Sequence, residues 1–370
     1  MIIEALDSLI GQTTEEIRAV VSEAAGLPAY RGSQVAEWLY RRSMPEMGGG
    51  FQADFARMTE LPKEARLALA EQFGGPPLAL TQAQTDPGDG TVKALARLTN
   101  GDHPIECVLL PDANRVSVCL STQAGCPMAC AFCATGTQGL TRNLTAGEIV
   151  AQYLLLQSLS PRRISHIVLM GMGEPLLNYE ATLKAIRIIN AECGVAMRHI
   201  TLSTVGIVPN IERLAEENLQ LTLAVSLHAP NDTLRTRLVP VNKTYPLSRL
   251  LPACRSYAAH TGRRLTFEYV LLKGVNDEPE HARELAQILK GMGAAVNVIP
   301  YNPTTVAEAF GRPDQTRIFA FRSILEDTGI VVTQRKERGR QIAAACGQLV
   351  TEATRQRPIS RELPVLVGAV

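Results

Sequence analysis

The chain has 370 residues, enough for one large domain and a smaller one, and its 46% hydrophobic and 20% charged residues are typical of a soluble globular protein. With 37 basic and 36 acidic residues the formal charge is +1, so any nucleic-acid contact has to come from local basic patches. The N-terminus lacks the pattern of a signal peptide and no apolar run approaches the ~20 residues of a membrane span, so we expect a cytoplasmic protein without membrane contact.

The first elements along the chain are expected to be helices. Residues 1–80 contain three helix-forming stretches separated by turn formers such as Gly48-Gly49-Gly50, and this pattern predicts a small helical accessory domain suited to RNA recognition. Two short strand-like runs with Asn100-Gly101 between them follow. They predict a β extension over residues 81–114 that leads into the next domain.

From about residue 115 the pattern changes to short β-branched runs that alternate with amphipathic stretches. Six such strand–helix units follow one another within residues 115–345. They predict an α/β fold in which a parallel sheet with right-handed crossovers curves into a partial (β/α)6 barrel. Because a closed barrel of this kind has eight units, we expect an open mouth that admits a large substrate. Residues 346–370 are expected to form a terminal loop and tail.

The segment GCPMACAFCATG places Cys126, Cys130 and Cys133 on one short loop after the first predicted barrel strand. Three thiolates can bind three irons of a [4Fe–4S] cluster, which leaves the fourth iron free to chelate S-adenosylmethionine and to deliver the electron that cleaves it. A structural zinc site is the alternative. Zinc prefers four protein ligands, usually as two spaced pairs, and no second pair lies nearby. We therefore expect a radical-SAM enzyme with one cluster per chain.

The cluster loop is followed by GMGEPLLNYE, STVGIVPNI, VSLHAPND, IPYNP and a terminal AACGQL, all within residues 106–349. In this order the motifs resemble the RlmN/Cfr family of radical-SAM RNA adenine methyltransferases, above all its adenine-C2 branch. The resemblance implies methylation of an adenosine in the peptidyl-transferase region of 23S rRNA and of the adenosine 3′ to the anticodon in tRNA. Methylation at adenine C8 of the same rRNA nucleotide is the alternative, followed by a non-catalytic RNA-binding module with a structural metal.

The resemblance also assigns residues to S-adenosylmethionine. The glycine of the GMGEP segment lets the backbone approach a ligand closely. Period-2 alternation in LTLAVSLH directs Ser226 and His228 toward the cavity and Leu227 away from it, so that Leu227 could contribute only through its backbone. The implied cofactor-binding residues are Gly173, Glu174, Ser203, Ser226, Leu227, His228 and Asn302.

Two cysteines outside the cluster loop and one glutamate complete the expected site. The resemblance implies that Cys346 takes a methyl group from the first of two S-adenosylmethionine molecules used per turnover, and that a radical from the second activates it for addition to the base. Glu106 would then remove the ring proton, and Cys119 would attack the Cys346 sulfur. This step releases the product and leaves a Cys119–Cys346 disulfide that must be reduced again.

The implied partners are 23S rRNA, tRNA and a one-electron reductant such as flavodoxin or ferredoxin, for a chain that we expect to be monomeric. Basic residues from Arg335 to Arg340 lead directly to Cys346, which makes them the preferred candidates for phosphate contact. Two positions depart from the family's pattern: Gln341 replaces an aspartate and Leu140 an aromatic residue. We expect the change at Gln341 to affect the ordering or the RNA contact of the terminal loop.

Overall fold

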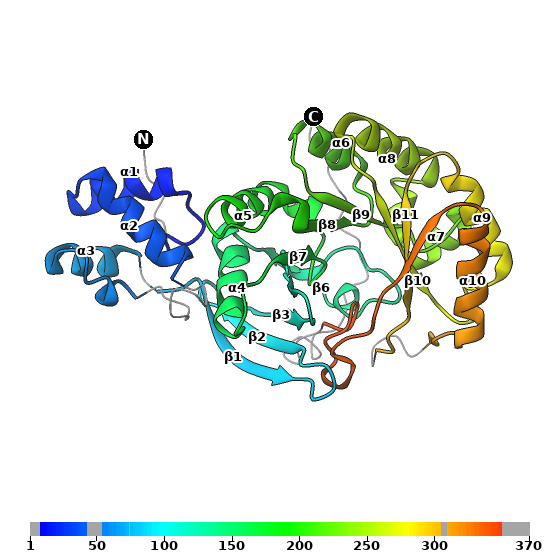
Figure 1. Ribbon diagram of the computed structural model, residues 1–370, viewed down its shortest axis with the longest axis horizontal. Coiled ribbons are helices and arrows are strands. Elements are labelled where there is room, and N and C mark those ends of the chain that lie inside the picture. Colours follow the sequence, from blue (N-terminus) through cyan, green and yellow to red (C-terminus); the bar gives the residue numbers. More distant parts are fainter. Residues whose placement is uncertain (1–7, 43–53, 74, 305–308, 350–370) are drawn as a thin grey trace.

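The computed structural model describes residues 8–42, 54–73, 75–304 and 309–349. The glycine turn at 48–50 and the tail after residue 349 lie outside these ranges. Three helices, α1 (Thr14–Ala25), α2 (Ala29–Tyr40) and α3 (Lys63–Phe73), form the expected helical unit at one end of the molecule (Figure 1). A capping box between Thr13 and Glu16 begins α1. Glu16 also binds Lys184 at 2.9 Å, which attaches the unit to a helix of the barrel.

A single sheet of ten strands runs through the rest of the molecule, in the order β1-β2-β3-β4-β7-β8-β9-β10-β11-β12. Its first part is antiparallel and consists of β1 (Leu78–Thr85), β2 (Val92–Leu98) and β3 (Pro104–Pro111), with β3 pairing to β4 (Val116–Cys119). The predicted extension thus has three strands instead of two. The sequence of β1 gave no signal because every residue after Leu78 is exposed, so no alternation of apolar and polar residues marks the strand.

The parallel part of the sheet confirms the expected partial barrel. Beyond β4 it contains β7 (His166–Leu169), β8 (Ile200–Thr204), β9 (Thr222–Ser226), β10 (Thr266–Leu271), β11 (Ala295–Pro300) and β12 (Val331–Gln334). Helices cover its outer face, as Figure 1 shows: α4 (Ala146–Ser158), α5 (Tyr179–Ala191), α6 (Val208–Glu216), α7 (Asp232–Leu238), α8 (Leu247–Thr261), α9 (Pro279–Leu289) and α10 (Gln315–Asp327). The strand β12 was not predicted, and it adds a parallel strand at the edge after β11.

The core lies between this sheet and its helices. On β9 the predicted alternation holds, since Leu221, Leu223, Val225 and Leu227 are fully buried. The opposite row, which contains Ser226, faces the inside of the barrel, so the carboxyl ends of the parallel strands are left for polar side chains. In the described part of the chain, no helix has the length and apolar character that a membrane crossing requires.

Candidate active site

The three clustered cysteines lie on the tip of a small separate hairpin. Cys126 ends β5 (Gln123–Cys126), which pairs antiparallel with β6 (Gly139–Asn143), and the connection between them carries Cys130 and Cys133. The loop was expected to follow the first barrel strand directly, so the hairpin is a correction. Gly125 has φ +81°, and a Cβ there would lie 2.0 Å from the Gly139 carbonyl oxygen. Only glycine allows the two strands to approach so closely.

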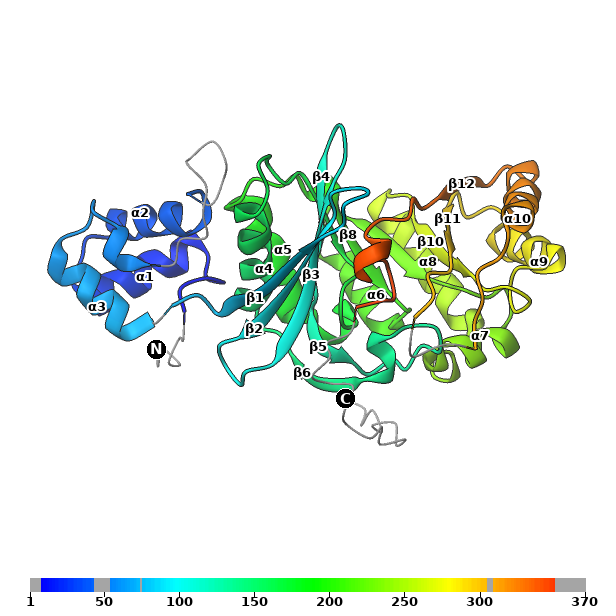
Figure 2. The ribbon, with the colours of Figure 1, turned by 90° about the horizontal axis from the view of Figure 1, so that it is seen from below.

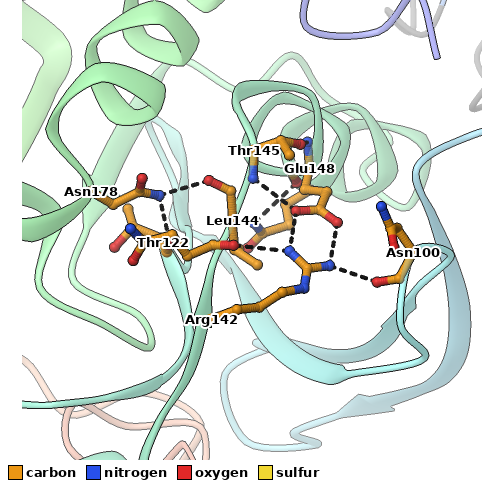
Figure 3. Close-up of polar contacts among 9 residues, drawn as sticks. Asn100, Thr122, Arg142, Leu144, Thr145, Glu148 and Asn178 are labelled. Carbon is orange, nitrogen blue, oxygen red and sulfur yellow. Dashed lines mark hydrogen bonds and ion pairs between the residues drawn. The ribbon is translucent and has the colours of Figure 1, made fainter. Parts of the chain in front are cut away.

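Polar contacts fix the base of this hairpin to the barrel (Figure 3). Arg142 on β6 donates two hydrogen bonds, of 2.8 and 2.6 Å, to the Glu148 carboxylate in the first turn of α4, and a third of 2.8 Å to the Asn100 carbonyl. Glu148 also forms a capping box with Thr145, which begins α4. On the other side of the hairpin, the Asn178 side chain donates to the carbonyls of Thr122 and Leu144.

Replacing Arg142 with methionine is expected to destabilise the protein by about 2–3 kcal/mol, because it leaves the Glu148 carboxylate buried without its cation. The expected loss of stability is smaller than is usual for breaking a buried ion pair, because the Arg142 side chain is 27% exposed. Chemical denaturation measures the change. Arg97→Met is the matched control, since the Arg97–Asp102 pair is exposed on both sides, and we expect little change there. Equal losses in the two variants would contradict the assigned role of Arg142.

A cavity of about 140 Å³ opens between the cluster hairpin and the carboxyl ends of the parallel strands. All three cysteines of the hairpin line it. Six of the seven residues expected to bind the cofactor also line it: Gly173, Glu174, Ser203, Ser226, His228 and Asn302. Leu227 does not. Its N–H donates to the Glu268 carbonyl and its own carbonyl accepts one hydrogen bond from Arg235. A carbonyl oxygen can accept two hydrogen bonds, so the backbone contribution of Leu227 stays a prediction.

Glu174 presents a carboxylate to this cavity although the residue is only 2% exposed. Its two oxygens accept hydrogen bonds from the backbone N–H groups of Leu176, at 3.0 Å, and Val205, at 2.8 Å. Burial nevertheless raises the pKa of Glu174 to about 7, and these hydrogen bonds only partly oppose the shift. The carboxyl is therefore poised to become charged when a cation, such as the ammonium of an amino acid, enters the cavity.

The raised pKa of Glu174 predicts a pH dependence of cofactor binding. An acid with a pKa of about 7 is neutral below that pH and cannot pair with an ammonium group there. We expect the affinity of the cluster-loaded, oxidised protein for S-adenosylmethionine to fall roughly tenfold per pH unit below pH 7. Equilibrium binding between pH 5 and 8 measures this. Glu174→Gln should bind weakly with a flat profile, and an unchanged slope in that variant would contradict the assignment.

His228 follows β9 with φ +59°, a left-handed conformation that is uncommon for a residue with a side chain. Its Nδ1 accepts the Val270 N–H at 3.0 Å. Burial, assisted by the charge of Arg235, lowers the pKa of His228 to about 3. The imidazole is thus neutral with its hydrogen on Nε2. The edge of Phe132 from the cluster loop packs against its ring at 4.8 Å, so His228 also supports the loop.

Cys346 lies where this cavity meets a second, smaller one of about 80 Å³. It lines both, whereas Cys119 lines only the smaller one. Cys346 is exposed, and Cys119 is 8% exposed. All eight cysteines are free in this structure, including these two, so the Cys119–Cys346 disulfide expected after turnover is not shown and stays a prediction.

The loop that carries Cys346 is held against the cluster hairpin. The Ala134 N–H donates to the Gly347 carbonyl at 2.8 Å, and the Thr135 hydroxyl donates to the Leu349 carbonyl at 2.7 Å. This C-terminal segment, drawn in red, returns to the middle of the molecule beside β3 (Figure 2). The thiol that should carry the methyl group is thereby placed next to the loop that should carry the iron, although more than 200 residues separate the two in the sequence.

Two aspartates in the turn between β1 and β2 bind the same C-terminal segment a few residues before Cys346. Asp89 accepts the N–H of Gly339 at 2.9 Å, and Asp86 accepts the N–H of Gln341 at 3.0 Å. Gln341 thus takes part through its backbone N–H, which any residue except proline could supply. The predicted effect of Gln341 on loop ordering is therefore not visible in these contacts. Its effect on RNA contact stays a prediction.

Glu106, the expected proton acceptor, lies on the same face of β3 as Val108, which lines the smaller cavity opposite Cys119. Glu106 does not itself line either cavity. Its carboxylate pairs with Lys93 on β2 at 3.3 Å, and both side chains are largely buried. The structure therefore places Glu106 two residues along β3 from the partner of Cys119, in an ion pair, and its role stays a prediction.

The sequence did not indicate that Glu268 belongs to the site, or that Arg335 lies inside it. Glu268 on β10 lines the larger cavity and was not singled out, although alternation along FEYVLL could have indicated it. Arg335, which was expected to contact RNA, lines both cavities, and its contact with RNA stays a prediction. Burial raises the pKa of the Cys346 thiol, and the nearby charge of Arg335 opposes this shift.

The residues present fit the groups that a radical-SAM site would hold. Burial and neighbouring thiol charges raise the pKa of Cys126 and Cys130, a penalty that bound iron would reverse. The Asn302 Oδ1 is buried without a hydrogen-bond partner among the described residues, which suits a donor on a bound ligand.

Comparisons with known proteins agree with this site. Residues 120–286 match the model of the radical SAM superfamily. A protein of Thermosynechococcus vestitus named probable dual-specificity RNA methyltransferase RlmN is 49% identical over 341 residues, 92% of this chain and 97% of the relative. The protein of the same name from Gloeobacter violaceus is 47% identical over 356 residues, which are 96% of this chain and 97% of that relative. A radical SAM methyltransferase from Sphaerobacter thermophilus, solved by crystallography, superposes with a TM-score of 0.86 at 47% identity, covering 92% of this chain and 98% of its own.

Proposed function

The chain belongs to the RlmN family of radical-SAM RNA methyltransferases, and we propose that it methylates C2 of an adenosine in the peptidyl-transferase region of 23S rRNA and of the adenosine 3′ to the anticodon in tRNA. The observation that carries the proposal is the position of Cys346. This thiol opens into the cavity lined by the cluster cysteines and also into the one lined by Cys119. A methyl carrier has to reach its donor on one side and release its product on the other.

The family implies a [4Fe–4S] cluster and S-adenosylmethionine. We propose that Cys126, Cys130 and Cys133 bind the cluster, which when loaded supplies the electron for reductive cleavage of the cofactor. Glu174 and Asn302 would bind the cofactor's amino acid and ribose groups, because one offers a carboxylate and the other an unpaired acceptor. Two cofactor molecules are needed per turnover, one for the methyl group and one for the radical.

Around the RNA base, the roles divide between the two cavities. Cys346 would hold the methyl group and form the bond to adenine. Glu106, with Lys93 beside it, would accept the ring proton. Cys119 would then attack the Cys346 sulfur, and the bond between that sulfur and the methylene carbon would break as the disulfide forms. The carbon would leave with the electron pair of that bond and take up a proton, which gives the methyl group of the product. Reduction of the disulfide and a one-electron donor such as flavodoxin or ferredoxin would complete the cycle of a monomeric, cytoplasmic enzyme.

Anaerobic turnover with a 23S rRNA fragment or tRNA tests the proposal. The cluster is reconstituted, S-adenosylmethionine and a low-potential reductant are added, and the digested RNA is compared by mass spectrometry with C2- and C8-methyladenosine standards. We expect C2-methyladenosine from both RNAs. C8-methyladenosine would overturn the regiochemistry and keep the chemistry. Cofactor cleavage without any methylated adenosine would overturn the substrate.

A further inference from the structure

Arg235 on α7 is a buried cation without an anionic partner. The residue is fully buried. Its four shortest hydrogen bonds, between 2.6 and 3.2 Å, all go to neutral oxygens: the carbonyls of Val205, Ser226 and Leu227 and the side chain of Asn242. In the part of the chain that the structure describes, no carboxylate lies within ion-pair distance of it. Buried charges in proteins are normally paired, because an unpaired one is costly.

The surroundings of Arg235 indicate where its counter-charge arises. The helix α7 ends at Leu238, whose carbonyl accepts the Ala131 N–H at 3.0 Å, and Ala131 lies between two of the cluster cysteines. Val205 and Ser226, to which Arg235 donates, both line the cavity. Among the ionisable neighbours of Arg235, the Cys130 thiol has the largest effect on the pKa of Arg235, which it raises. Burial lowers the pKa of Arg235 to about 10, so the guanidinium is still protonated at neutral pH.

We infer that Arg235 is the buried counter-charge of the iron–sulfur cluster and raises the cluster's reduction potential. This rests on the proposed function, which places the cluster on Cys126, Cys130 and Cys133. Three thiolates outweigh the 2+ core of an oxidised cluster, and one-electron reduction adds a further negative charge. A fixed positive charge in a low-dielectric interior stabilises the more negative form more strongly. Arg235 therefore makes it easier for the reductant to load the cluster.

A purely structural role has to be separated from this one, because Arg235 also joins the ends of β8 and β9 through its carbonyl partners. Arg235→Lys keeps the positive charge but loses most of the hydrogen bonds that the guanidinium donates, whereas Arg235→Gln loses the charge. A reduction potential that depends on charge will separate the two variants. Thermal stability, which depends on the hydrogen bonds, will decrease in both.

The experiment is a redox titration of the reconstituted protein followed by electron paramagnetic resonance. We expect Arg235→Gln to lower the reduction potential by about 59 mV or more, a tenfold change in the reduction equilibrium of a one-electron couple, and Arg235→Lys to stay close to wild type. Arg237→Gln is the control, since Arg237 is exposed on the same helix. Asp232 is the carboxylate that raises the pKa of Arg235. Asp232→Asn removes its negative charge and should therefore shift the reduction potential of the cluster upward.

Equal potentials for the glutamine and lysine variants would overturn the inference, because the effect would then follow the hydrogen bonds. If Arg235→Gln does not fold, the remaining variants decide: a lysine variant at the wild-type potential together with an upward shift in Asp232→Asn supports the inference, and any other pair of results overturns it. A wild-type protein that takes up no iron after reconstitution would overturn the proposed cluster site itself. The iron content therefore tests the proposed cluster site, and the reduction potential tests the role of Arg235.

Discussion

Replacing Cys346 with alanine is expected to abolish RNA methylation, by roughly 10³-fold or more, since it removes the thiol that lines both cavities and should carry the methyl group. The loss should be confined to methyl transfer. Cys126, Cys130 and Cys133 line the cavity without relying on the Cys346 side chain, so iron content and reductive cleavage of S-adenosylmethionine should persist. Nucleoside mass spectrometry measures the methylated product, and chromatography of the nucleoside released from the cofactor measures cleavage.

Cys193→Ala is the matched control for this experiment. Cys193 is buried and lines neither cavity, so its loss should reduce stability slightly and leave methylation near the wild-type level. Methylation by Cys346→Ala above about a tenth of wild type would show that another group carries the methyl. Loss of both iron and methylation would instead show that the terminal loop, held by Ala134 and Thr135, is needed to order the cluster hairpin.

The sequence predicted the barrel and the cavity because both follow from periodic patterns. Strand alternation alone placed Ser226 and His228 in the cavity and the four leucine and valine positions of the same stretch in the core. The cysteine spacing placed three thiols on one loop. These features are local, and each depends on residues only a few positions apart, so a single sequence contains the information.

Long-range placement could not be predicted in the same way. Nothing near Arg335 in the sequence shows that it faces two cavities rather than solvent, since that depends on how β12 joins the sheet edge. The same holds for Asp86 and Asp89, which hold a segment about 250 residues away. The resemblance to a family supplied the pairing of Cys119 with Cys346, and the shared cavity is consistent with it.

Replacing Cys119 with alanine is expected to stop the enzyme after one methyl transfer, with the RNA still attached to Cys346. Cys119 is the other thiol that lines the smaller cavity, so its loss removes the nucleophile that should free the Cys346 sulfur. An adduct that approaches one RNA per protein should accumulate, visible on a denaturing gel with labelled RNA. The double variant with Cys346→Ala should form none. Several equivalents of released, methylated RNA from Cys119→Ala would exclude Cys119 as the resolving thiol.

The environment of Cys119 adds a pH dependence to this step. Burial and the neighbouring Cys346 raise the pKa of the Cys119 thiol to about 12, and Arg335 only partly opposes the shift. Because the thiolate is the attacking form, the wild-type rate of product release should rise with pH across the neutral range, up to tenfold per pH unit where this step limits turnover. Arg335→Gln should slow release further at each pH, since it removes a cation whose charge opposes the raised pKa of both thiols. A release rate independent of both pH and Arg335 would mean that the thiolate forms by proton transfer within the adduct.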